Sequence, residues 1–422
     1  MRRWAAALAL LAAPVDAQDD AAVQVAAEAA LQAKYAGRYL DAANAWRPLA
    51  FDPTGRPVPG DAYDSWIEAE TRMTIERPGP PAPLSPLPPA DLARLRAAIP
   101  RDALAEIVAR ARRTRVVVLN EDHGQPRGRA FGLAVARALR PLGYRVLALE
   151  TLEANPDPAL AARRLAGLIR DGYPRQVSGY YTADPVFGDF VRQALAMGYR
   201  PLACEQIPTE RLADPDDQIV ARELAQATHL AAALRAEPSA KMFVYVGFGH
   251  VAEAPAQPGA TPWMAARLKV MTGIDPLTID QVALAEDPSD KRGDGYAVIA
   301  DRATGRSVVL FTGAKPLVVG QYAGAVDLQV VHPRVRHIAG RPDWLLGMGR
   351  QPTPVPPTLL PHAGTRLVQA FLASEAADAI PIDQVLVTAG RPAPSLMLPP
   401  RARVRYATQD EAGAPPLQAA QP

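Results

Sequence analysis

Four short apolar runs, separated by helix-length segments, constrain the fold of this chain more than any other feature of its sequence. They cover residues 115–120, 145–150, 200–205 and 241–247 and read RVVVLN, RVLALE, RPLACE and KMFVYVG. Nearly continuous apolar runs of this length are typical of strands that helices cover on both faces. Because segments with a helical pattern lie between them, the chain predicts βαβ units and a mostly parallel sheet.

The remaining elements of this α/β core follow the same alternation. Helices are expected at 102–113, 128–142, 157–170, 186–197, 208–236 and 262–271. A short strand is expected at 276–280, and the runs at 295–301 and 307–312 predict a hairpin at the sheet edge. We therefore predict an α/β core domain, flanked by helices, over residues 93–320.

A small helical region and a proline-rich linker precede the core. In residues 18–77, Tyr39, Ala42, Ala43 and Trp46 have the spacing of one helix face. Residues 78–92 contain the stretch Pro78 to Pro89 with seven prolines, a composition that favours an extended linker.

After the core, the helical pattern weakens. We expect a β-rich accessory region at 321–408, with a helix at 365–376 and strands at 384–387 and 404–406. Residues 409–422 lack periodicity and predict a mobile tail.

The first residues have the pattern of a signal peptide. Met1-Arg2-Arg3 precede an apolar run over residues 4–13, and Val15-Asp16-Ala17 forms a small-x-small cleavage site. We therefore expect cleavage after residue 17 and a periplasmic or secreted protein. The apolar run is well short of the roughly 20 residues that a membrane-spanning helix needs, and no later run is long enough either, so we expect no transmembrane anchor.

Composition excludes several classes of protein. Hydrophobic residues make up 49% of the chain, which is enough for a folded core. The formal net charge is +2 without a basic block, so nucleic-acid binding is not expected. The single cysteine, Cys204, can form neither an internal disulfide nor a cysteine metal cage.

Ionisable residues stand at the end of each of the four main strands. They are Glu121 and His123 after the first, Glu150 and Glu205 at the ends of the next two, and His250 after the fourth. One such residue alone is usually a cap or a solvated loop residue. Because the carboxyl ends of parallel strands face one crevice, we expect these five side chains to converge there.

The same segments carry a family resemblance. Residues 116–124 (VVVLNEDHG), 143–150 (GYRVLALE) and 247–250 (GFGH) resemble the superfamily that contains erythromycin esterase-like hydrolases, ChaN-type haem-binding uptake proteins and TIKI-type metalloproteases. The resemblance covers roughly residues 100–285. Asn120 stands where the family usually has glycine. Since asparagine tolerates a left-handed backbone, we expect the sharp turn to be kept there.

The resemblance implies roles for three residues. His123 would be the general base that activates water, Glu150 its orienting or metal-binding partner, and His250 a second base, proton donor or ligand. These roles, with Glu121 as a further catalytic carboxylate, imply a hydrolase that acts on an ester, lactone or amide.

Hydrolysis needs further groups around the imidazole. A carboxylate must fix its tautomer, and a positive charge or a metal must stabilise the oxyanion. Arg222 is a candidate for that positive charge, and Glu205 binds substrate or supports the inner residues. Tyr181, with Tyr180, is expected to form a wall or lid over a small-molecule substrate.

Two alternatives use the same atoms. A divalent metal would be bound by His123, His250 and either Glu121 or Glu150. A haem-uptake protein without turnover would use His123 or His250 as axial ligand. The wall of its slot would consist of Tyr180, Tyr181, Phe187, Met197 and Tyr199. The sequence does not decide between a metal-free, a metal and a haem site, and the remaining histidines (His229, His332, His337 and His362) are assigned to structure or solvent.

Overall fold

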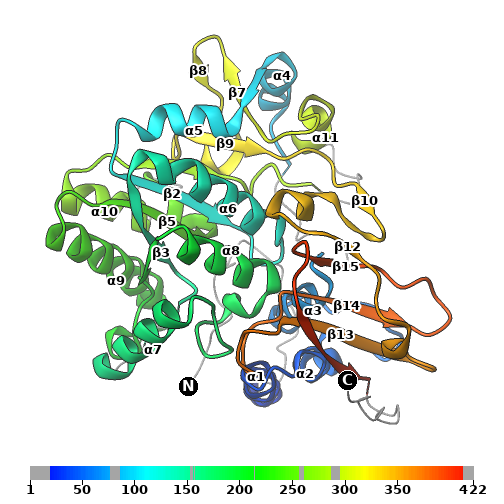
Figure 1. Ribbon diagram of the computed structural model, residues 1–422. Coiled ribbons are helices and arrows are strands. Elements are labelled where there is room, and N and C mark those ends of the chain that lie inside the picture. Colours follow the sequence, from blue (N-terminus) through cyan, green and yellow to red (C-terminus); the bar gives the residue numbers. More distant parts are fainter. Residues whose placement is uncertain are drawn as a thin grey trace.

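The computed structural model describes residues 20–76, 86–152, 155, 157–212, 214–255, 261–286 and 295–411. The expected signal peptide lies outside these residues, as do most of the linker and of the tail. The centre of the protein is a nine-stranded sheet with the order β1-β7-β9-β6-β2-β5-β3-β4, in which β8 pairs with β7 (Figure 1).

The sheet has a parallel part and an antiparallel edge. The parallel strands are β2 (Val116–Glu121), β3 (Tyr144–Leu149), β4 (Arg200–Ala203), β5 (Lys241–Gly247), β6 (Leu277–Asp280) and β9 (Leu328–Val331). The antiparallel edge consists of β1 (Ile99–Asp102), β7 (Val308–Thr312) and β8 (Lys315–Pro316). The predicted α/β fold with a mostly parallel sheet is therefore confirmed.

Helices cover both faces of this sheet, because the side chains that its strands turn toward each face are apolar. Val117 and Leu119 of β2 belong to the core beneath α5 (Ala103–Ala111), α6 (Arg127–Leu139) and α8 (Pro185–Ala196). Val116 and Val118 belong to the opposite core, beneath α9 (Pro215–Ala236) and α10 (Met264–Thr272). A further helix, α7 (Pro158–Asp171), contacts β4 and contributes Leu168 to the first of these cores.

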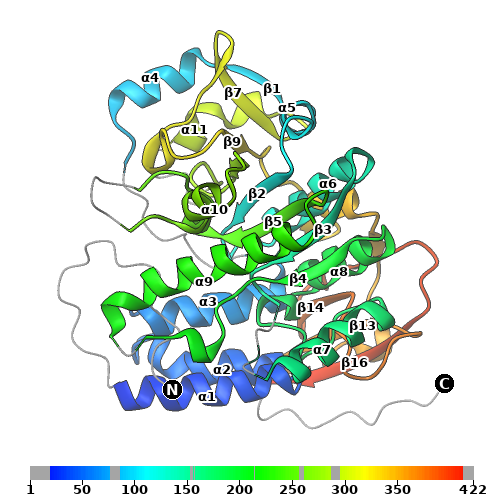
Figure 2. The same cartoon turned by 90° about the vertical axis from the view of Figure 1, so that its left-hand side faces the viewer.

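Three helices form the N-terminal region, as expected: α1 (Asp20–Tyr35), α2 (Tyr39–Ala50) and α3 (Asp61–Thr74). The predicted face of Tyr39, Ala42, Ala43 and Trp46 is buried. Figure 2 shows these helices beneath the lower end of the parallel strands. Glu68, Thr71 and Arg72 of α3 line one small pocket with His123, which follows β2, so α3 lies at the carboxyl ends of the strands.

Helix α4 (Pro89–Ala97) begins inside the expected linker at 78–92. Proline is well accepted in the first turn of a helix, since the N–H it lacks would have no intrahelical partner there. Proline content alone therefore placed the end of the linker too late.

Residues 295–301 do not form the expected strand. They form α11 (Gly295–Ile299) and a following 3₁₀ turn, Ala300–Arg302. Gly295, Tyr296 and Ile299 are buried, which is the spacing of a helix face. Strand β7 instead pairs with β1, β8 and β9.

The C-terminal region is β-rich, although its elements differ from those expected. Strand β9 lies beyond residue 320 but belongs to the main sheet. The helix expected at 365–376 is wrong, because β13 (Thr365–Leu372) pairs on both sides with β14 (Asp383–Thr388) and β16 (Val404–Asp410). The expected tail at 409–422 begins later, since β16 continues to Asp410.

A second small sheet joins β12 (Gln351–Thr353) and β15 (Leu396–Leu398), and a third joins β10 (His337–Ile338) and β11 (Arg341–Pro342). Within the described ranges, no helix combines the length and hydropathy of a membrane span.

Candidate active site

Five predicted residues meet at the carboxyl edge of the parallel sheet. Strand β5 lies between β2 and β3, so the ends of these three strands are neighbours. Glu121 ends β2, Glu150 follows β3, and His250 lies in the 3₁₀ turn Phe248–Val251 directly after β5. His123 and Glu205 follow β2 and β4 and reach the same cluster through the contacts described next.

His123 is held at one ring nitrogen by a buried carboxylate. Its Nδ1 lies 2.9 Å from Oε1 of Glu121, whose side chain is only 2% exposed. Arg129 donates two hydrogen bonds to the same carboxylate, Nε to Oε2 at 2.9 Å and Nη2 to Oε1 at 3.0 Å. Arg129 is also paired with Asp184, with Nη1 3.3 Å from Oδ2. This chain of charges fixes the imidazole in position.

These contacts also set the protonation of the pair. Burial alone would raise the pKa of Glu121, but Arg129 and His123 outweigh burial and hold it below its ordinary value. An ionised carboxylate only accepts hydrogen bonds, so neutral His123 carries its proton on Nδ1 and presents a free lone pair at Nε2. Burial opposes protonation of His123, but Glu121 and then Glu150 outweigh it and raise the pKa of the imidazole.

The His123 ring is also confined by its neighbours. Tyr181 stacks on it with a centroid distance of 3.8 Å and an interplanar angle of 12°, and Phe248 meets it edge-on at 5.1 Å. A Cβ atom placed on Gly247 would lie 2.6 Å from both Cε1 and Nε2 of the ring and 3.3 Å from Oε2 of Glu150. The imidazole therefore packs against the bare backbone of Gly247, beside Glu150.

Glu150 occupies the centre of the site. Its Oε1 accepts a hydrogen bond from Nη2 of Arg222 at 2.5 Å, and its Oε2 accepts one from the backbone N–H of Gly247. Burial alone would raise the pKa of Glu150, but His250, Arg222 and His123 lower it to about 2. Glu150 is therefore ionised throughout the neutral range.

Arg222 joins Glu150 to Glu205. Its Nε donates to Oε1 of Glu205 at 2.9 Å and its Nη2 to Oε2 at 2.6 Å. Gln226 donates a further bond to Glu205, at 3.2 Å. Glu205 thus positions Arg222, whose side chain remains 27% exposed.

His250 repeats the arrangement of His123 with different partners. Its Nδ1 lies 2.7 Å from Oε1 of Glu223, which is 1% exposed, and its Nε2 lies 3.7 Å from Oε1 of Glu150. The other oxygen of Glu223 accepts the backbone N–H of Met264 at 2.7 Å. Burial opposes protonation, but Glu223 and Glu150 outweigh it and raise the pKa of His250. Two imidazoles, each beside its own buried carboxylate, therefore share Glu150.

Asn120 does not form the left-handed turn that we expected. It lies within β2 and is fully buried. Its side chain donates to the backbone carbonyl of Phe248 at 3.0 Å and to Asp280 at 2.9 Å, and accepts the N–H of Gln281 at 2.8 Å. The left-handed residue is instead Phe248, with φ of 37°, in the turn that carries His250. Asn120 therefore anchors a strained turn on the neighbouring strand.

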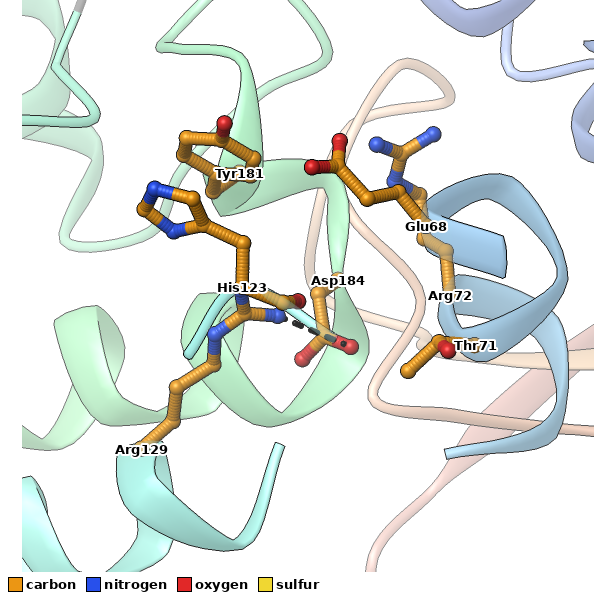
Figure 3. Close-up of a pocket in the computed structure, with 7 residues that line it drawn as sticks. All are labelled: Glu68, Thr71, Arg72, His123, Arg129, Tyr181 and Asp184. Atoms are coloured by element: carbon orange, nitrogen blue, oxygen red, sulfur yellow. Dashed lines mark hydrogen bonds and ion pairs between the residues drawn. The ribbon is translucent and has the colours of Figure 1, made fainter. Parts of the chain in front are cut away.

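The structure adds site residues that the sequence analysis missed. Arg129 lies in the first turns of α6, and Glu223 lies next to Arg222 on α9. A further group comes from α3, which lies far from the motifs in the sequence. Figure 3 shows Glu68 and Arg72 of α3 facing His123 and Tyr181 across a small pocket, which Thr71, Arg129 and Asp184 complete.

A bound metal does not fit the site as it stands. Among the described residues, no group of three or more His, Cys, Asp or Glu side chains is arranged to hold a metal ion. The predicted ligands His123, His250 and Glu150 do lie together, but Oε1 of Glu150 already accepts a hydrogen bond from Nη2 of Arg222. The Nδ1 atoms of both imidazoles face their own carboxylates.

Haem fits the described surroundings no better. Phe187 and Tyr199, expected in the wall of a haem slot, are buried in the hydrophobic core, and Met197 packs against that core.

The histidines assigned to structure or solvent lie in other surroundings. His229 bonds with Glu210 and the backbone of Cys204, and His337 pairs with Glu76. His332 is buried between Ser307 and Gln281, and burial lowers the pKa of His332 well below its ordinary value. Cys204 is fully buried in the core.

Comparison with known proteins gives no family. No protein-family model and no curated protein matches the chain. Among solved structures, it is similar to one described as bacterial protein toxins (19% identity, TM-score 0.32, 43% of this chain and 36% of that chain). It is also similar to the type III effector HopBA1 (15%, 0.33, 56% and 96%). A third is RRSP, a MARTX toxin effector domain from Vibrio vulnificus CMCP6 (17%, 0.31, 59% and 43%). The chain thus spans 36% of the first of these chains, and similarities of this size show no shared activity.

Proposed function

We propose that this protein is an exported hydrolase that attacks an ester, lactone or amide with water, as the resemblance to erythromycin esterase-like proteins implies. The observation that carries the proposal is the pair of imidazoles, each beside its own buried carboxylate and both near Glu150. Its export rests on the sequence of the first 17 residues alone.

In this proposal His123 is the general base. With Nδ1 occupied by Glu121, its Nε2 takes a proton from water while the water oxygen attacks the carbonyl carbon. Arg129 keeps Glu121 ionised and in position, and so acts through it. Glu150 stabilises the imidazolium that forms, because its negative charge lies beside the ring.

His250 and Arg222 complete the reaction. The negative charge that develops on the carbonyl oxygen is stabilised by Arg222, whose side chain is 27% exposed. His250 begins as imidazolium, which Glu223 and Glu150 favour, and gives its proton to the leaving oxygen or nitrogen. The proton taken by His123 and the proton given by His250 balance, so the products are a carboxylic acid and an alcohol or amine.

The test is hydrolysis of p-nitrophenyl acetate by the purified mature protein. We expect turnover above the buffer rate and its loss, by about a hundredfold or more, in His123→Ala and in His250→Ala. His362→Ala, at an exposed position, is the matched control and keeps the activity. Equal rates in the wild type and in both site variants, with unchanged circular dichroism, would refute the proposal.

A further inference from the structure

The segment that carries Tyr181 is held by the residue directly after Glu150. Oγ1 of Thr151 accepts the backbone N–H of Tyr181 at 2.8 Å and that of Thr182 at 3.1 Å. The carbonyl oxygen of Thr151 accepts the N–H of Tyr180 at 3.2 Å. Thr151 is only 6% exposed, so removal of its hydroxyl would leave two backbone donors without this acceptor.

The same segment is also attached to the N-terminal helices. A Cβ atom on Gly179 would lie 1.9 Å from the carbonyl oxygen of Thr151, so only glycine permits this close approach. On the other side, Nζ of Lys34 in α1 donates to the carbonyl oxygen of Gly179 at 2.8 Å. The hydroxyl of Tyr39 in α2 donates to the carbonyl oxygen of Ala183 at 3.0 Å. The segment is therefore fixed between the end of β3 and the N-terminal helices.

Tyr181 in turn limits the movement of His123. The hydrogen bond to Glu121 holds the imidazole at one atom, Nδ1, and leaves the ring free to tilt about it. The Tyr181 ring lies over the imidazole (Figure 3), nearly parallel to it at a centroid distance of 3.8 Å. The backbone of Gly247 closes off the edge at Cε1 and Nε2. Tilting therefore requires that Tyr181 moves.

We propose that Thr151 is a positioning residue of this site. Its hydroxyl holds the backbone of Tyr181, and the stacked Tyr181 ring keeps the His123 imidazole in the orientation that Glu121 sets. The importance of this orientation for hydrolysis rests on the proposed function. The orientation itself is a property of the fold and can be measured without a substrate.

The orientation is tested by NMR on the full mature protein, labelled with ¹³C at Cε1 of histidine. The ring current of an aromatic ring stacked on an imidazole moves the Hε1 resonance of that imidazole upfield. His123→Ala assigns the resonance of His123 by its disappearance. At high pH, where His123 is neutral, we expect Thr151→Val to move this resonance downfield. Thr151→Ser keeps the accepting oxygen and should restore the wild-type position.

The matched control is Thr272→Val at the end of α10. The hydroxyl of Thr272 also accepts a backbone N–H, that of Ile274 at 3.2 Å, but lies outside the site, so the His123 resonance should not move. Should Thr151→Val not fold, Tyr181→Leu replaces it, with Tyr181→Phe as the variant that keeps the stacked ring and the upfield resonance. A resonance that stays in place in Thr151→Val, or in Tyr181→Leu, would overturn the proposal.

A second arm measures hydrolysis of p-nitrophenyl acetate by the same variants. A catalytic group that is misplaced by about 1 Å loses on the order of a hundredfold in rate, so a loosened ring should cost kcat about tenfold or more in Thr151→Val, with KM nearly unchanged. Thr151→Ser should restore kcat. Unchanged kcat in a variant whose resonance has moved would overturn the role of Thr151 in the reaction. Shifted resonances in a protein without any turnover would instead remove the proposed function and leave the positioning of His123 intact.

Discussion

A methyl group at Gly247 is the sharpest probe of this site. Gly247 has φ of −83° and ψ of 150°, a backbone conformation that alanine adopts without strain. The new Cβ would nevertheless lie 2.6 Å from Cε1 and Nε2 of His123. The effect of Gly247→Ala therefore comes from the contacts of the new methyl group, of which those with the imidazole are much closer than the 3.3 Å to Oε2 of Glu150.

The displacement can be worked out from these contacts. To reach an ordinary contact of about 3.4 Å or more, the His123 ring must move by roughly 0.8 Å. It cannot do so freely, because Tyr181 stacks on one face and Glu121 holds Nδ1. A misplacement of about 1 Å costs a catalytic group on the order of a hundredfold in rate, and overpacking costs about 1–3 kcal/mol in stability.

The assay is kcat/KM for an aryl ester together with chemical denaturation of the same sample. We expect Gly247→Ala to remain folded and to lose about two orders of magnitude in kcat/KM. The matched control is Gly347→Ala, because a Cβ there meets nothing within 4 Å. Full activity of Gly247→Ala in a wild type that is active would show that Nε2 of His123 does not take part in the reaction.

Three further predictions concern the charges around the imidazoles. Glu121→Gln removes the group that holds the pKa of His123 up against burial, so the acid limb of the kcat/KM pH profile moves to lower pH by roughly one pH unit or more; an unmoved limb would exclude His123 as the base. Glu223→Gln lowers the pKa of His250 in the same way and moves the alkaline limb to lower pH, whereas a shift of the acid limb would reverse the two roles. Arg129→Met leaves the buried carboxylates of Glu121 and Asp184 without their cation and lowers the free energy of unfolding by about 3–5 kcal/mol in urea denaturation. The control is Arg170→Met, at a side chain that is 74% exposed. Equal losses of unfolding free energy in the two variants would contradict the reasoning.

Acid stability gives a separate test of Glu150. The pKa of Glu150 is lowered to about 2 from an ordinary value of 4.5, so its ionised form stabilises the fold above pH 4.5 and this contribution is lost as the pH falls toward 2. The unfolding free energy of Glu150→Gln should thus fall below that of the wild type at neutral pH, and the two should converge near pH 2. A difference between them that does not change with pH would contradict the assigned pKa.

The meeting of residues 121, 123, 150, 205 and 250 could be predicted because parallel strands place their carboxyl ends together. Their partners could not. Arg129 and Glu223 lie on helices, and a sequence pattern does not fix which way a helix turns a polar residue toward a neighbouring strand. Glu68 belongs to a region with no motif, and only the packing of α3 brings it to the site.

The errors in the C-terminal region have a different cause. The segment TRLVQAFL is short and apolar, and such runs are ambiguous between helix and strand. Pairing decides its structure, since β13 has β14 on one side and β16 on the other. Asn120 illustrates the same limit, because its bonds to Phe248, Asp280 and Gln281 join it to segments distant in the sequence.

The C-terminal strands support α3, the helix that forms one wall of the pocket beside His123. Gln384 of β14 donates to the backbone carbonyl of Arg72 at 2.7 Å, and Gln409 of β16 donates to that of Gly37 at 2.7 Å. Met73 of α3 packs with Leu367 of β13. Removal of β14 and β16 would therefore leave both imidazoles in their loops but take away these bonds to the backbone of the N-terminal helices.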